Sequence, residues 1–312
     1  MTVPTADRAS APAQAVAVRP LVLPAPDRGD DLQVRVSAPT TGTELPIVVF
    51  SHGFGWSMDG YGPIADHWAA HGFVVVQPTH LDSTTLALAP EDPRTPCIWR
   101  YRIEDLVRVI DELERIEAAV PGLAGRIDRT RIAATGHSWG ATSASALLGA
   151  RVVDKDGHPG EDMTDSRVAA GVLLALAGTG GPDLTPFAAE QFPFMNPDFT
   201  GLKAPALLVA GENDQSLLSV RGPDWWTDGY HQSPGAESLL TVAGAEHSLG
   251  GIVTHLAANE MAEHESPDKL ALVQRVTTAY LRKALGVGDE NWAQVQAELA
   301  DGAESLGRLE SK

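Results

Sequence analysis

Short apolar runs recur along the chain, and segments with a helical repeat of apolar positions lie between most of them. Residues 45–50 and 73–77 are such runs, and their length suits strands that are buried on both faces of a sheet. Residues 99–120 instead repeat apolar positions such as Ile103 and Leu106 at the spacing of an amphipathic helix. Strands that alternate with helices predict a mostly parallel central sheet with helices on both faces, in the α/β class. The predicted strands are 16–23, 32–38, 45–50, 73–77, 131–135, 168–176, 204–210 and 238–242, and the predicted helices are 61–71, 99–120, 141–150 and 269–285.

The same pattern divides the chain into three parts. Residues 1–20 are rich in Ala, Pro and Val, so we predict a disordered leader there. Residues 21–288 carry the alternating strands and helices and are predicted to form one α/β domain. Residues 289–312 form an acidic tail in which Trp292 and Val295 have helical spacing, so we predict a last, C-terminal helix.

Composition limits the partners of the protein. The formal net charge of −18 argues against nucleic acids and anionic membrane surfaces. No run reaches the ~18 consecutive apolar residues of a transmembrane helix, so we expect no membrane span. The single cysteine, Cys97, and the lack of a signal-peptide pattern favour the cytoplasm. A secreted form that has lost its signal peptide would show the same features, and the oligomeric state stays open.

We expect neither a cofactor nor a metal ion. His67 and His71 have the i, i+4 spacing of metal ligands on a helix, but no third ligand is evident beside them.

One motif has the context that nucleophilic catalysis requires. Gly136-His137-Ser138-Trp139-Gly140 lies between the strand 131–135 and the helix 141–150. In a G-x-S-x-G turn of this kind the serine adopts a strained conformation, and the glycines let neighbouring chain pass close by. The turn presents the serine hydroxyl at a helix N-terminus. We therefore predict that Ser138 is a nucleophile, whereas the alternative is that it only caps the helix.

An acid and a base follow two later strands. Asp214 comes after the strand 204–210, and His247 comes after the strand 238–242. Both are expected at the same sheet edge as Ser138, and the order Ser, Asp, His is that of the α/β-hydrolase triad. Asp183 follows the preceding strand, 168–176, and is the alternative acid.

Two turns near Ser138 provide candidate oxyanion donors and aromatic side chains. The backbone N–H groups of Trp139 and Phe54 are the predicted oxyanion hole. Aromatic residues also cluster in the segments that should overhang the site, where they serve either as pocket walls or as core. The predicted substrate-binding residues are Phe54, Trp56, Trp139, Phe187, Phe192 and Trp225.

Two sets of motifs resemble known families. Ser51-His52-Gly53-Phe54-Gly55 and the following Tyr61-Gly-Pro-Ile-Ala-Asp resemble the chlorophyllase and platelet-activating-factor acetylhydrolase branch of the α/β-hydrolases. Gly211-Glu-Asn-Asp214 and Gly-Ala-Glu-His247-Ser are similar to the acid and base turns of cutinase-like esterases. The resemblance covers about residues 45–285 and implies the α/β-hydrolase fold with a Ser-His-Asp triad.

The resulting prediction is a serine carboxylic ester hydrolase that forms an acyl-enzyme intermediate on a neutral, hydrophobic small-molecule ester. An amidase, a lactonase or a thioesterase could use the same triad. A non-catalytic binding module on this scaffold is the third alternative. The acyl and alcohol groups, and whether polymeric esters are accepted, stay open.

Overall fold

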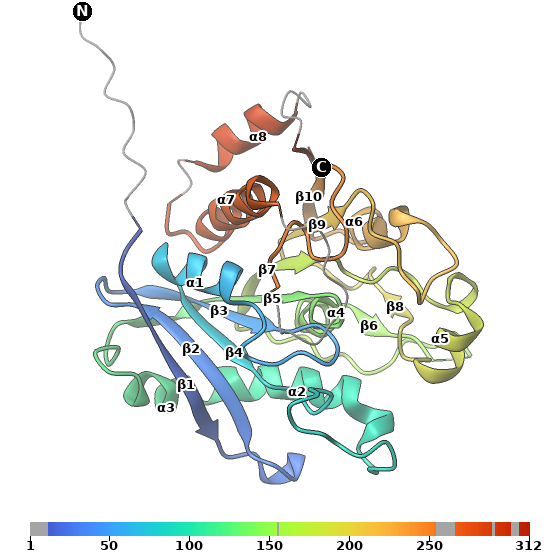
Figure 1. The fold of residues 1–312 in the computed structure, drawn as a ribbon, viewed down its shortest axis with the longest axis horizontal. Helices are drawn as coiled ribbons and strands as arrows, with labels where there is room; N and C mark the ends of the chain where they lie inside the picture. The colour runs from blue at the N-terminus through green and yellow to red at the C-terminus, as the bar shows by residue number, and fades with distance from the viewer. Residues whose placement is uncertain (1–11, 155, 254–265, 289–290, 301–305) are drawn as a thin grey trace, which may run out of the picture.

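The computed structural model describes residues 12–154, 156–253, 266–288, 291–300 and 306–312. Within these ranges the chain forms a nine-stranded sheet with the order β1-β2-β4-β3-β5-β7-β9-β10-β11 (Figure 1). The strands β4, β3, β5, β7, β9 and β10 run parallel, and β1, β2 and β11 are antiparallel to the strands they pair with. The predicted fold class is therefore confirmed. The strands are β1 (Ala15–Leu23), β2 (Leu32–Pro39), β3 (Leu45–Ser51), β4 (Val74–Pro78), β5 (Ile127–His137), β7 (Val168–Leu174), β9 (Ala206–Gly211), β10 (Ala236–Val242) and β11 (Gly307–Ser311), with a separate pair β6 (Arg151–Val152) and β8 (Pro197–Asp198).

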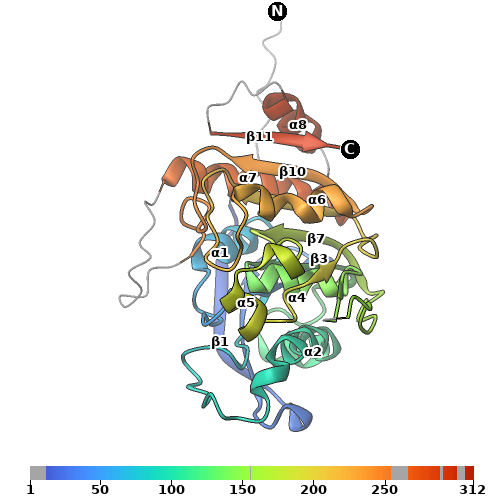
Figure 2. The ribbon, with the colours of Figure 1, turned by 90° about the vertical axis from the view of Figure 1, so that its right-hand side faces the viewer.

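Helices cover both faces of the sheet, as Figures 1 and 2 show. They are α1 (Gly62–Ala70), α2 (Ile98–Asp111), α3 (Leu113–Ala119), α4 (Trp139–Leu147), α5 (Pro186–Gln191), α6 (Asp228–Gln232), α7 (Pro267–Ala284) and α8 (Trp292–Ala300), with short 3-10 helices η1 (Pro26–Arg28), η2 (Thr95–Cys97), η3 (Gly181–Asp183) and η4 (Pro223–Thr227). Helices α1, α7 and α8 contribute to one buried cluster, which contains Trp68 and Leu299. Helices α2, α3 and α4 contribute to the other, which contains Leu106 and Leu147. The sheet between these layers is buried on both faces, so β3 is buried along its whole length and β9 consists of apolar residues alone.

The two ends of the chain differ from the prediction. Strand β1 starts at Ala15 and pairs with β2, so residues 15–20 belong to the sheet and the predicted leader is wrong there. The physical reason is that β2 offers β1 a free row of backbone hydrogen-bonding groups. Residues 1–11 of the predicted leader lie outside the described ranges.

The C-terminal segment contains a strand as well as the predicted helix. Trp292, Val295 and Leu299 are buried on α8. After α8 the chain returns as β11, which pairs antiparallel with β10 from Ser238↔Ser311 to Val242↔Gly307. This segment therefore completes the sheet, and 289–312 is more than the helical tail that the sequence predicts.

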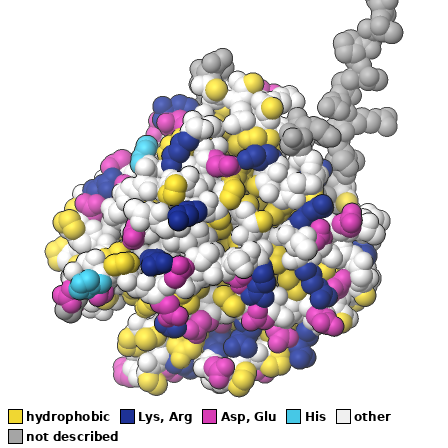
Figure 3. Space-filling model, turned by 180° about the vertical axis from the view of Figure 1, so that it is seen from behind, with side chains coloured by type: hydrophobic (Ala, Val, Ile, Leu, Met, Phe, Trp, Pro, Cys, Tyr) yellow, Lys and Arg dark blue, Asp and Glu magenta, His cyan; other side chains and the backbone are white. Residues whose placement is uncertain are grey.

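Side chains of both charges are interspersed on the face shown in Figure 3. The excess of acidic residues is therefore spread among basic ones on this face. Partly exposed ion pairs such as Arg167–Asp111 also join the two charges. In the described part of the chain, no helix combines the length and the apolar character that crossing a membrane requires.

Candidate active site

The turn between β5 and α4 holds Ser138 in a strained conformation. Ser138 has φ 55° and ψ −122°, a backbone conformation that residues other than glycine rarely adopt. Its backbone N–H donates to the carbonyl of Leu174 at the end of β7 (2.9 Å), which ties the turn to the neighbouring strand. The serine therefore lies at the carboxyl edge of the parallel strands and immediately before the first residue of a helix.

The glycines of the motif are required by close backbone contacts. A Cβ on Gly140 would lie 1.9 Å from the carbonyl oxygen of Ser51, and a Cβ on Gly136 would lie 2.3 Å from the carbonyl carbon of Gly140. Because glycine has no side chain, the end of β3 can pass directly against the first turn of α4. This contact brings the turn after β3, which contains Phe54, next to Ser138.

The structure brings Asp214 and His247 together. His247 Nδ1 and Asp214 Oδ2 are 2.8 Å apart, and the Asp214 side chain is 1% exposed. A carboxylate can only accept here, so Nδ1 carries the proton and Nε2 carries the lone pair that can accept one. Trp226 supports both residues, because its Nε1–H donates to the carbonyl of Asp214 (3.0 Å) and its ring lies 4.9 Å from that of His247.

Asp183, the alternative acid, lies in a different group. Its carboxylate accepts a bond from Thr179 and pairs with Arg221 at 3.1 Å. Arg221 also pairs with Asp224 and Asp228. This ion-pair cluster engages Asp183, whereas Asp214 is the partner of His247 Nδ1.

The two predicted oxyanion donors have no other acceptor. Among the described residues, neither the N–H of Phe54 nor that of Trp139 donates to a protein atom. The preceding N–H, that of Gly53, is already donated to Tyr61 Oη at 2.9 Å. The N–H groups of Phe54 and Trp139 are thus free to bind a ligand oxygen.

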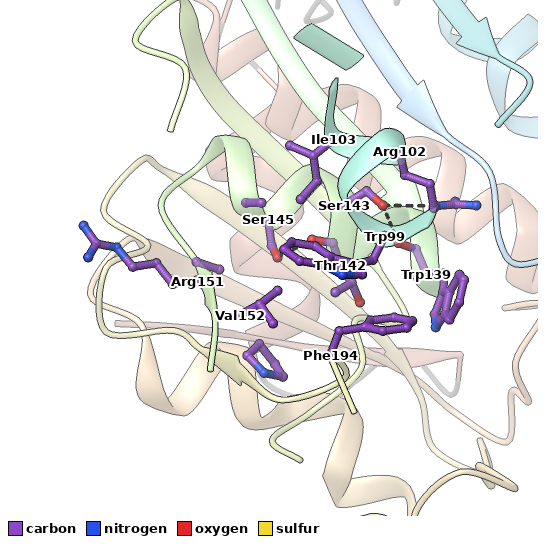
Figure 4. Close-up of a pocket in the computed structure, with 13 residues that line it drawn as sticks. Trp99, Arg102, Ile103, Trp139, Thr142, Ser143, Ser145, Arg151, Val152 and Phe194 are labelled. Atoms are coloured by element: carbon purple, nitrogen blue, oxygen red, sulfur yellow. Dashed lines mark hydrogen bonds between the residues drawn. The ribbon is translucent and has the colours of Figure 1, made fainter. Parts of the chain in front are cut away.

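A buried arginine supports the turn after β3. Arg102 of α2 is 1% exposed and pairs with Asp82, which accepts the N–H of Gly55 with its other oxygen (3.0 Å). The guanidinium also donates to the carbonyl of His52 and to Ser143 of α4 (3.1 Å), next to Trp139 in Figure 4. The sequence analysis missed this residue. Its signal was a charged position on the apolar stripe of the predicted helix 99–120.

A second set of buried polar residues lies beneath the same turn. His80 is bonded to Ser51 Oγ (2.9 Å) and to Asp105 (2.9 Å), and Asp105 also pairs with Arg28 (2.8 Å). His52 donates from Nδ1 to the carbonyl of Gly53 and accepts the N–H of His80 at Nε2. Burial lowers the pKa of His52 to about 4, so its ring is neutral and can play both roles at neutral pH.

Four of the six predicted substrate-binding aromatics form one cluster. The ring centroids of Phe54 and Trp139 are 4.8 Å apart, those of Trp139 and Phe192 are 5.5 Å apart, and those of Phe187 and Phe192 are 5.9 Å apart. Phe194 joins this cluster through Trp139 (5.0 Å).

The other two predicted aromatics, Trp56 and Trp225, lie outside this cluster. Trp56 packs near Tyr61, with the ring centroids 6.1 Å apart. Trp225 is fully buried, and its Nε1–H donates to the carbonyl of Thr179. Trp225 therefore belongs to the core, which was the other interpretation of the aromatic segments.

The aromatic cluster forms one wall of a groove of about 710 Å³. This volume is in the range of small-molecule sites. Phe54 and Trp139, the residue that follows Ser138, line this groove together with Leu88 and Pro90 of the loop after β4 and Ile98 at the start of α2. A smaller, mostly apolar cavity lies behind Trp139, between α2 and α4, and Figure 4 shows Trp99 and Phe194 in its wall.

Comparisons with known proteins agree with this geometry. Residues 27–154 match the chlorophyllase family. Over 308 residues the chain is 22% identical to the platelet-activating factor acetylhydrolase of Cavia porcellus, and the match covers 85% of this chain. The chain spans 63% of the length of that relative. Together with the sheet and the serine turn, these matches identify the chain as an α/β-hydrolase-fold protein similar to the chlorophyllase and platelet-activating-factor acetylhydrolase branch, as the motifs predicted.

Proposed function

We propose that this chain is a serine ester hydrolase that works through an acyl-enzyme intermediate. Ser138 is the nucleophile, His247 the general base and Asp214 the residue that orients His247. The observation that carries the proposal is the 2.8 Å contact between His247 and Asp214, beside a turn that holds Ser138 at φ 55°. The chlorophyllase match and the acetylhydrolase relative support ester hydrolysis as the reaction class.

The reaction follows from the tautomer of His247, in which Nδ1 carries the proton and Nε2 can accept one. Nε2 accepts the Ser138 proton while Oγ attacks the ester carbonyl carbon, and the carbonyl oxygen becomes an oxyanion. The N–H groups of Phe54 and Trp139 donate to this oxyanion and contribute ~3–4 kcal/mol each. The C–O bond to the alcohol then breaks, and the alcohol leaves with the proton from Nε2. Water attacks the acyl-serine with His247 again as base, which releases the acid and restores Ser138.

The groove favours a hydrophobic acyl group. The leaving alcohol must receive its proton from His247 and therefore lies on the His247 side of the scissile bond. The oxyanion donors Phe54 and Trp139 line the groove, so the acyl substituent extends into it. Its lining is rich in Phe, Leu and Pro and also contains Asp82 and Glu190, so it favours a neutral chain over an anionic one. Its volume of about 710 Å³ exceeds what an acetyl group fills.

A fluorophosphonate probe and two ester series test this proposal. We expect the wild type to react with the probe and Ser138→Ala to remain unlabelled, with a rate loss of at least ~10³-fold. Nitrophenyl acetate, butyrate, octanoate and dodecanoate vary the acyl group, and acetates of increasingly long alcohols vary the other side. Rates should rise along the first series and change little along the second. A preference for the shortest or for charged acyl groups would contradict the assignment of the groove.

Matched substrates separate the alternatives. An ester, an amide and a thioester with the same acyl group distinguish an esterase from an amidase or a thioesterase that uses the same triad. A wild type that resists the probe would leave only the binding-module interpretation, because the probe requires an activated serine.

A further inference from the structure

A chain of hydrogen bonds connects the turn after β3 with the turn that carries His247. The N–H of Gly53 lies 2.9 Å from Tyr61 Oη, Tyr61 Oη lies 2.9 Å from His137 Nδ1, and His137 Nε2 lies 2.8 Å from the carbonyl oxygen of His247. Gly53 precedes the oxyanion candidate Phe54, and His137 precedes Ser138. This series of four hydrogen-bonded residues, which we call the relay, therefore contacts all three parts of the proposed site.

The two ends of the relay fix the direction of every hydrogen bond in it. The Gly53 N–H can only donate and the His247 carbonyl can only accept. His137 must therefore carry its proton on Nε2 and accept at Nδ1, and Tyr61 must accept from Gly53 and donate to His137. Each polar atom then has a partner of the right kind, so the arrangement is consistent throughout.

Both middle residues are removed from water. Tyr61 is fully buried, and His137 is 3% exposed. Burial, with a smaller contribution from the nearby His247, holds the pKa of His137 well below its usual value. The neutral ring that the bond directions require is thus its stable form at neutral pH. A buried group that loses its partner here has no water to replace it, which makes each bond costly to break.

We infer that Tyr61 and His137 are positioning residues that fix the Phe54 oxyanion turn and the His247 turn at a set distance from Ser138. This inference rests on the proposed function, since both turns matter through the reaction at Ser138. Neither side chain touches the substrate. Their contribution is that the two turns cannot shift independently, and a displacement of about 1 Å at a reacting group costs up to ~10²-fold in rate.

Tyr61→Phe tests the first half of the relay. The ring still packs against Phe50, whose centroid is 4.8 Å away, but the hydroxyl is lost. We expect kcat to fall about 10- to 100-fold with little change in KM, because the groove is untouched. Tyr280→Phe is the matched control. Tyr280 is also fully buried but bonds to Glu237 at the start of β10, whereas His247 follows the end of that strand. The kcat of Tyr280→Phe should therefore remain that of the wild type.

His137→Gln and His137→Asn separate the two bonds of the ring. Glutamine keeps a donor near the Nε2 position but loses the acceptor for Tyr61, and asparagine keeps an acceptor near Nδ1 but loses the donor to His247. Because Tyr61→Phe and His137→Gln break the same bond, the double variant should lose much less than the product of the two single losses. A Tyr61→Phe variant within about twofold of wild-type kcat, or multiplicative losses in the double variant, would overturn the relay.

A spectroscopic measurement tests the relay without turnover. In Ser138→Ala protein labelled with ¹⁵N-histidine, His137 should show a protonated Nε2 and an unprotonated Nδ1, and His137→Gln assigns its signals. A protonated Nδ1 would refute the relay even if the enzyme hydrolyses esters. The expected tautomer in a wild type that does not react with the fluorophosphonate probe would instead refute the proposed function and leave the hydrogen-bonded chain intact.

Discussion

Gly140 has no room for a side chain, because a Cβ there would lie 1.9 Å from the carbonyl oxygen of Ser51. Both atoms belong to backbone, so neither can rotate away. We expect Gly140→Ala to separate β3 from α4 and to prevent folding or lower the free energy of unfolding by more than ~4 kcal/mol. Gly222→Ala is the control, since φ there is −82° and the nearest atom would be 3.4 Å from the new Cβ. Expression and urea denaturation compare the two, and equal stability would show that the contact is not required.

The choice between the two candidate acids gives a second prediction. Asparagine at position 214 would offer an amide to His247 Nδ1 and stabilise the wrong tautomer, so Asp214→Asn should lower kcat by ~10⁴-fold. Asp183→Asn should change kcat by less than about threefold, because Asp183 pairs with the partly exposed Arg221. Steady-state kinetics on the best nitrophenyl ester measure both. A larger loss in the Asp183 variant would reverse the assignment.

At the scale of single residues, the sequence locates groups that follow strands but not groups that meet across the fold. Ser138, Asp214 and His247 could be proposed because each follows an apolar run. Asp183 could not be rejected by the same criterion, since it also follows one. The bond between Tyr61 and His137 joins residues 76 positions apart, and nothing in either neighbourhood of the sequence predicts it.

Among the elements, the predicted helix 99–120 is the clearest difference. It forms as α2 and α3, separated at Glu112 with φ −96° and ψ 13°. The apolar stripe continues across the break, because Ile110 and Leu113 are both buried, and neither proline nor glycine marks it. Hydrophobic periodicity therefore could not indicate the change of direction.

Strand β11 was also beyond sequence analysis, because its residues contain one buried leucine between polar positions. Leu309 is 5% exposed and belongs to the cluster that α7 and α8 cover. Its neighbour Arg308 has a side chain that is 60% exposed. This segment is a strand because its backbone pairs with β10, and its hydrophobic pattern does not indicate one. Without β11, β10 would form an open sheet edge.

This alternation predicts effects of different size for two neighbouring substitutions. Leu309→Asp buries a carboxylate without a partner and should lower the free energy of unfolding by about 3 kcal/mol or more. Arg308→Asp changes a side chain that faces solvent and should cost less than ~1 kcal/mol. Thermal denaturation with light scattering measures stability and association through the β10 edge. Similar melting temperatures for the two variants would mean that β11 does not pack as described.

For the whole molecule, the candidate active site at the carboxyl edge of the sheet and the stability of the fold depend on the same buried polar residues. His52, His80 and His137 are all buried beneath the site. Burial is the main cause that lowers the pKa of His52 to about 4 and the pKa values of His80 and His137 well below normal. Each ring is therefore neutral in the folded protein at pH values where it is already protonated in the unfolded chain.

The stability of the protein should consequently fall as pH decreases from about 6.5 towards 4. In this range the unfolded chain binds three protons on these histidines that the folded protein does not. Burial raises the pKa of Asp105 to about 7, so the folded protein keeps one proton that the unfolded chain loses, and this opposes one histidine. Summed over His52, His80, His137 and Asp105, the net difference of about two protons corresponds to ~2.7 kcal/mol per pH unit. His67, whose pKa burial also lowers to about 4, adds to this slope in the same direction. A marginally stable fold cannot sustain such a slope over two pH units.

Urea denaturation at a series of pH values measures this slope directly. His80→Asn keeps a donor for Asp105 and removes one titrating ring, so the slope should decrease by ~1.4 kcal/mol per pH unit. His158→Gln changes a side chain that is 78% exposed and should leave the slope unchanged. A free energy of unfolding that stays constant between pH 7 and pH 5 would contradict the neutral buried histidines and, with them, the bond directions assigned to His52 and His137.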